Sequence, residues 1–111
     1  MIVHQKDSFA PKDSLAYLIS PAVPIDQVVI RCTILNKSAD PKQFQDGLRY
    51  MYGWTRNLAS YPVDAFADQI GPLGALFPSD AGAGTYSVGC LNIWPNLNFV
   101  ILGNATFTYT G

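Results

Sequence analysis

Charged side chains are scarce in this sequence of 111 residues, and glutamate is absent altogether. Asp, Lys and Arg make up 14% of the chain, against about 25% in a typical globular domain. No Lys or Arg follows Arg56, and residues 81–111 carry no charge. With a net charge of −1 and no basic cluster, the sequence excludes a general nucleic-acid-binding protein, because phosphate binding requires grouped cations. Its 49% hydrophobic content excludes a disordered chain.

Histidine and cysteine are too few for the common catalytic and zinc sites. His4 is the single histidine and lies in a polar segment, where packing would not hold a catalytic base in place. Cys32 and Cys90 each lie in an apolar, strand-like run, which favours two buried free thiols. A disulfide between them stays open, because the sequence does not give their separation. We therefore expect no enzyme, no metal site and no cofactor.

Long apolar runs are missing as well. No stretch approaches the 18 or so apolar residues of a membrane-spanning helix, and the N-terminus lacks the apolar region of a secretory signal. We therefore expect a chain that is not bound to a membrane.

Alternating apolar residues predict three strands, at residues 27–36, 85–94 and 97–109. In the first of them, Ile30, Cys32 and Ile34 are expected to share one face with Val28. Val, Ile, Thr and aromatic residues are frequent in all three segments, as is typical of strands.

Two helices are expected between the first strand and the second. Asp40 before Pro41 is typical of a helix start, and apolar residues then recur at helical spacing, which predicts a helix over residues 41–59. Pro62 and the Gly71-Pro72 pair predict a shorter helix over residues 62–70, followed by a loop.

This order predicts an α+β domain in which one long and one short helix pack on one face of a mostly antiparallel sheet. Residues 1–13 are expected to form an N-terminal arm, and residues 14–111 a single domain.

The aromatic content and the uncharged C-terminus predict subunit contacts. A domain of 12.1 kDa buries only part of its surface, and an exposed edge strand normally carries charge that prevents pairing. We expect another subunit to cover the edge at 104–111 or to pair with it. The predicted interface residues are Arg49, Tyr50, Trp54, Ser79, Asp80, Thr106, Phe107, Thr108 and Tyr109.

Residues 28–36 (VVIRCTILN), 40–53 (DPKQFQDGLRYMYG) and 57–63 (NLASYPV), with the later GPLG and FTY segments, resemble the centre of tail terminator proteins of tailed phages. These are also called tail completion or neck-associated minor capsid proteins. The likeness spans residues 25–111, although the family opens with a helix that residues 1–20 do not predict. It implies a virion protein, assembled in the host cytoplasm, that forms a hexameric ring with itself and joins the tail tube to other virion proteins.

Two alternatives remain open. One is a capsid decoration or cement protein, which would bind the capsid lattice. The other is a small ligand-binding α+β domain, in which Arg31, Tyr86 and Asn92 would converge on a pocket.

Overall fold

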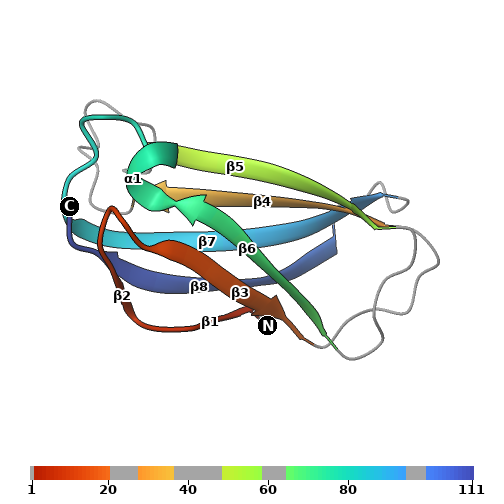
Figure 1. The fold of residues 1–111 in the computed structure, drawn as a ribbon. Coiled ribbons are helices and arrows are strands. Elements are labelled where there is room, and N and C mark those ends of the chain that lie inside the picture. The colour runs from red at the N-terminus through yellow and green to blue at the C-terminus, as the bar shows by residue number, and fades with distance from the viewer. Residues whose placement is uncertain (1, 21–27, 37–48, 59–64, 95–99) are drawn as a thin grey trace.

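The computed structural model describes residues 2–20, 28–36, 49–58, 65–94 and 100–111. These residues form eight strands and one short helix (Figure 1). The elements are β1 (Ile2–His4), β2 (Ser8–Phe9), β3 (Ser14–Ile19), β4 (Val28–Asn36), β5 (Arg49–Leu58), β6 (Phe66–Pro72), α1 (Leu73–Leu76), β7 (Gly84–Trp94) and β8 (Val100–Tyr109).

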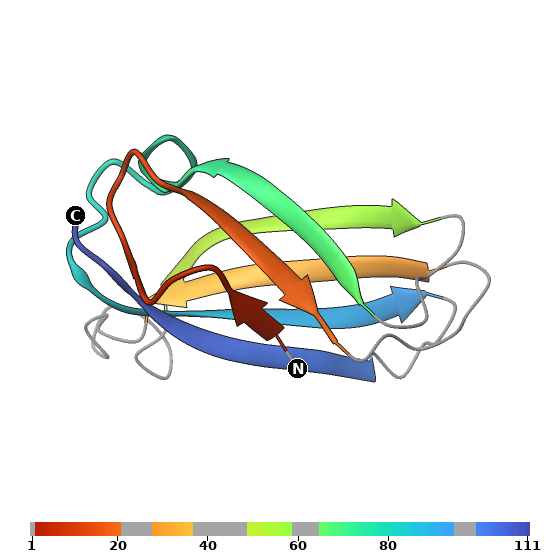
Figure 2. The same ribbon diagram turned by 60° about the horizontal axis from the view of Figure 1, so that its bottom comes forward.

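The strands form two sheets that pack face to face, as Figure 2 shows. One sheet has the order β1-β3-β6 and the other the order β2-β8-β7-β4-β5. All of the pairs are antiparallel except β2 with β8. Within the five-stranded sheet, the order β8-β7-β4-β5 resembles one sheet of an immunoglobulin-type sandwich. At the corner before β7, the Tyr86 hydroxyl donates to the Gly82 carbonyl at 2.6 Å.

The core lies between the sheets and follows the alternation of each strand. In β4, Ile30, Cys32 and Ile34 are fully buried, as the sequence predicted. The facing sheet contributes Leu15 and Ile19 of β3. A cluster of stacked and edge-to-face rings fills one end of the core and contains Phe77, Tyr86, Phe107 and Tyr109.

The prediction of an α+β fold is wrong, because residues 49–58 and 66–72 are strands. The error in β5 has a geometric cause. A register shift opposite Ile34 and Leu35 leaves Met51 as an extra residue in β5. Met51 and Trp54 are therefore both buried although they are three residues apart, which imitates the spacing of a helix. The remainder of the two predicted helices, at 41–48, 59 and 62–64, lies outside the described residues.

Other segments agree with the prediction or refine it. The strands predicted at 27–36 and 85–94 are confirmed as β4 and β7, and the third is confirmed as β8 from Val100 onward. The one described helix, α1, lies where a loop was expected.

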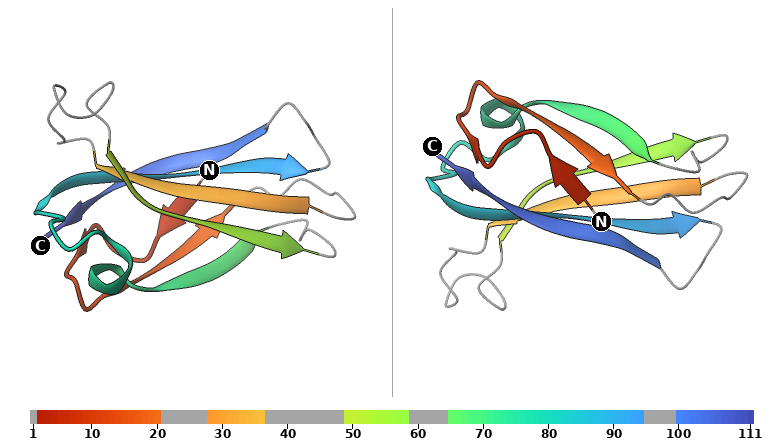
Figure 3. Two further views of the ribbon diagram at one scale, coloured as in Figure 1. Left: turned by 90° about the horizontal axis from the view of Figure 1, so that it is seen from above. Right: turned by 90° about the horizontal axis from the view of Figure 1, so that it is seen from below.

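Residues expected to form an N-terminal arm pair with both sheets. β1 joins β3 in one sheet, and β2 joins β8 in the other. Figure 3 shows β1 lying beside β8, at the edge of the sandwich opposite β5.

Candidate functional site

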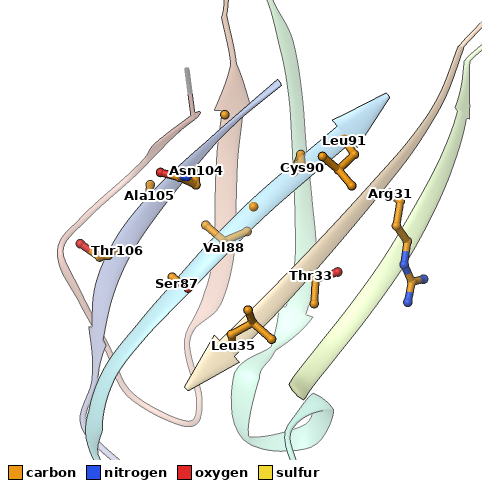
Figure 4. Close-up of a pocket in the computed structure, with 12 residues that line it drawn as sticks. Arg31, Thr33, Leu35, Ser87, Val88, Cys90, Leu91, Asn104, Ala105 and Thr106 are labelled. Atoms are coloured by element: carbon orange, nitrogen blue, oxygen red, sulfur yellow. The ribbon is translucent and has the colours of Figure 1, made fainter. Parts of the chain in front are cut away.

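A shallow hollow of about 370 Å³ lies on the outward face of the five-stranded sheet, over β4, β7 and β8 (Figure 4). β4 lines it with Arg31, Thr33 and Leu35. β7 contributes Ser87, Gly89 and Leu91, and β8 contributes Asn104 and Thr106. Apart from Leu91, these residues are small or polar. The volume is at the lower end of the range of small-molecule sites, about 300–1,000 Å³.

One row of cross-strand neighbours forms the middle of this hollow. Thr33 lies opposite Gly53 of β5 on one side and Gly89 of β7 on the other. Gly89 in turn lies opposite Asn104 of β8. Two of these four positions are glycine, and at Gly89 the sheet backbone is uncovered, because no neighbouring side chain crowds this position.

Gly53 makes room for two neighbouring side chains. A Cβ atom at this position would collide with the Tyr50 hydroxyl and lie 2.6 Å from Nη2 of Arg31. With glycine there, the Arg31 guanidinium crosses β5 and donates to Tyr50 Oη at 3.3 Å and to Thr55 Oγ1 at 3.4 Å.

The backbone conformation at position 103 requires glycine. Its φ of 148° lies outside the region that other residues readily adopt. It lies next to the register shift in the β7–β8 pair, where Cys90 faces Gly103 and Leu91 faces Ile101.

Gly89 has no such requirement. The nearest atoms to a Cβ at this position would be Asn104 Cβ and Gly103 O, both at the ordinary contact distance of 3.8 Å. Glycine within a strand reduces stability by about 0.5–1 kcal/mol relative to alanine. Such a glycine commonly marks a bulge, a tight bend, or a place where a ligand or another backbone approaches closely.

Among the described side chains that line the hollow, Arg31 alone is charged. The carboxylates of three described aspartates lie in ion pairs elsewhere: Asp13 with Lys6 at 2.9 Å, Asp68 with Arg56 at 3.0 Å and Asp80 with Arg49 at 2.5 Å. The Ala10 N–H, and then the Lys6 ammonium, lower the pKa of Asp13. The hydrogen bond from Arg49 lowers the pKa of Asp80 in the same way.

A polar network joins the two sheets on the side of β5 and β6. Trp54 Nε1 donates to Tyr17 Oη at 2.9 Å, and this hydroxyl donates to Asp68 Oδ2 at 2.7 Å. Arg56 Nε lies 3.0 Å from the same oxygen. Burial raises the pKa of the Tyr17 phenol far above its usual range, which the hydrogen bond from Trp54 partly offsets and that to Asp68 reinforces. The four groups satisfy one another, so the network is structural.

His4 is held away from the hollow. Its Nε2 lies 2.8 Å from the Thr106 carbonyl oxygen, and its ring meets the edges of Phe9 and Phe107. The buried Nδ1 has no hydrogen-bond partner. In the described part of the chain, His, Cys, Asp and Glu form no group of three that could hold a metal ion.

The two cysteines form a disulfide, so the expectation of two free thiols is wrong. Cys32 of β4 and Cys90 of β7 face each other in register, with their Cα atoms 4.1 Å apart. Both are buried, and the backbone of Cys90 contributes to the floor of the hollow. The sequence could not show this, because the pairing depends on β4 and β7 being neighbours in the sheet.

The predicted interface residues fall into three groups. Trp54, Phe107 and Tyr109 lie in the core. Arg49 and Asp80 form an ion pair. The remaining four, Tyr50, Ser79, Thr106 and Thr108, are exposed.

The residues of the alternative pocket do not converge. Tyr86 and Asn92 are buried, whereas Arg31 lines the hollow on the outward face. Sequence reasoning missed Thr33, Ser87, Gly89 and Asn104 as a group. The sequence held one signal for them: they alternate with the residues of the face that carries the cysteines, and Gly89 lies inside a predicted strand.

Comparison with known proteins assigns no family. No family model matches the sequence, and no curated protein matches it. Among solved structures, an alkylpurine DNA glycosylase AlkC from Pseudomonas fluorescens, bound to DNA containing an abasic site analogue, is similar with a TM-score of 0.46 and 13% identity. The match covers 100% of this chain and 29% of that chain. A similarity at this level assigns no activity.

Within the parts of the chain that the structure describes, no helix has the length and apolar content needed to cross a membrane.

Proposed function

We propose that this chain is a non-catalytic binding module whose site is the hollow on the outward face of β4, β7 and β8. Gly89 is the observation that carries the proposal. The fold accommodates a side chain at this position, and glycine weakens a strand, so the effect of glycine is to keep the hollow open.

The edges of the five-stranded sheet favour the face as the binding surface. The chain's own N-terminal segment covers part of β8, because Thr108 N donates to the Asp7 carbonyl and Thr110 N to the Phe9 carbonyl. On the opposite edge, β5 carries the bulge at Met51. Bulges and short covering strands are known to reduce edge pairing.

The disulfide bears on where the protein works. Disulfides persist mainly in oxidising environments such as cell surfaces, virion surfaces and secreted proteins. We therefore propose that the module works in such an environment, rather than in the reducing cytoplasm.

Ring assembly within a phage virion stays a prediction. The resemblance that implies it includes residues 40–53 and 57–63, whose described parts belong to strand β5. Light scattering would test the ring directly: a monomer under all conditions, including with tail-tube protein present, would contradict it.

The binding site is tested by NMR on the ¹⁵N-labelled full chain, titrated with a chemically diverse fragment library. Fragments are expected to shift the amide signals of Thr33, Gly89 and Asn104. In Gly89→Val these shifts should be lost, because the valine side chain fills the hollow.

Gly71→Val is the matched control. Gly71 also lies in a strand, a Cβ there would meet nothing within 4 Å, and it belongs to the other sheet. It should bind fragments as the wild type does. Fragments that bind elsewhere only, or equally well to Gly89→Val, would disprove the proposed site.

A further inference from the structure

The charge of the described residues that line the hollow bears on the class of ligand. None of these residues carries a carboxylate that could pair with a cationic ligand. The one cation among them, Arg31, already donates to Tyr50 and Thr55. A nucleic acid or another polyanion requires several cations, so the charge favours an uncharged ligand.

The hydrogen-bonding groups favour a ligand with many hydroxyls. Thr33, Ser87 and Thr106 place hydroxyl groups around the hollow, and Asn104 adds an amide. Each hydroxyl both donates and accepts, and the amide offers two donors and an acceptor. This set matches a partner that also donates and accepts at several points.

The floor and one side of the site are apolar. Gly89 leaves the backbone uncovered at the floor, and Leu35 and Leu91 lie at the sides. Tyr50 lies opposite Leu35 in β5, and 54% of it is exposed. An aromatic ring of this kind combines a flat apolar face with a polar tip.

We propose that the hollow binds a neutral carbohydrate, with a sugar ring seated over Gly89 and Tyr50 contacting the neighbouring ring. Sugar rings combine the two properties that the site presents, because their hydroxyls point outward around the ring while their C–H groups form apolar faces. This inference rests on the proposed function, and it names the ligand class of the same site.

The test titrates the full-length ¹⁵N-labelled protein with cellohexaose, maltohexaose and mannohexaose, and with a hexasaccharide of galacturonic acid as the charged comparison. At least one neutral sugar should shift the amide signals around Gly89, and the charged one should bind more weakly. Thr33→Val removes a hydroxyl while keeping the shape, and it should raise Kd about 2- to 10-fold. Tyr50→Ala should raise Kd at least as much, and Gly71→Val should leave it unchanged.

Three results would overturn the inference. If fragments of other chemistry bind at the hollow and none of the neutral sugars does, the carbohydrate assignment fails while the proposed binding site stands. If nothing binds at the hollow, both fail. Shifts at the hollow that depend on protein concentration without sugar would identify a second copy of the chain as the occupant instead.

Discussion

At the scale of single residues, the glycines of this chain differ in what their neighbours allow. Gly53 and Gly74 are confined, since a Cβ atom at Gly74 would lie 2.7 Å from Pro11 Cβ and 3.0 Å from the Pro11 carbonyl oxygen. Gly103 is held by its positive φ. Gly89 is unrestricted, as Gly71 and Gly82 are, and of these three it is the one that lines the hollow.

The contrast predicts opposite effects of the same substitution. Gly89→Ala should raise the free energy of unfolding by about 0.5–1 kcal/mol, because alanine restricts the unfolded chain and fits the native space. Gly74→Ala should lower it by about 1–3 kcal/mol, because the methyl group meets the Pro11 backbone. Urea denaturation of both variants measures the two effects. A loss of stability in Gly89→Ala would show that the fold itself needs glycine there.

At the scale of elements, the two sheets are joined by apolar packing and by the network of Tyr17, Trp54, Arg56 and Asp68. Tyr17 and Asp68 belong to β3 and β6 of one sheet. Trp54 and Arg56 belong to β5 of the other. The network therefore fixes β5, an edge strand, against the opposite sheet.

Tyr17→Phe should lower the free energy of unfolding by about 1–3 kcal/mol, because it leaves the Trp54 N–H and the Asp68 carboxylate without the partner between them. The Tyr17 phenol also makes stability depend on pH. Its pKa is raised in the folded state, so its contribution is complete below the unfolded pKa of about 10 and is lost as the pH rises above that value.

Chemical denaturation between pH 8 and pH 11 measures this dependence. The wild type should lose more stability over the range than Tyr17→Phe does. Equal slopes in the two proteins would mean that Tyr17 titrates alike in the folded and unfolded chains.

The elements also show why the sequence predicted some strands and missed others. β4 and β7 alternate regularly, and the alternation alone places Ile30, Cys32 and Val88 in the core. β5 has a bulge, which breaks the alternation at Met51. β6 lies at the edge of its sheet, with Ile70 as its one buried residue, so its sequence carries little periodic signal.

At the scale of the whole molecule, the disulfide connects parts of the chain that are 58 residues apart in sequence. It lies in the middle of the five-stranded sheet, between β4 and β7, which are two of the three strands that line the hollow. It therefore constrains both the fold and the floor of the proposed site.

Replacing both cysteines, as Cys32→Ala with Cys90→Ala, should lower the free energy of unfolding by about 2–5 kcal/mol, because the unfolded chain regains the entropy of a long loop. Thermal unfolding with and without reductant measures the effect in the wild type, and the double variant should not respond to reductant. Thiol labelling of the unreduced, denatured wild type should find no free thiol. Full labelling would show that the two cysteines are not bonded.

The sequence by itself determined the local features of this protein: its two central strands, their buried faces, its low charge and its uncharged C-terminal part. These follow from alternation and composition, which are properties of neighbouring residues. Only the tertiary structure decided which strands are neighbours. It thereby decided that Cys32 meets Cys90, that the N-terminal segment covers the edge of β8, and that Thr33, Gly89 and Asn104 form one row. Such contacts join residues far apart in the chain, and their energies depend on the packing of both sheets, so no local pattern encodes them.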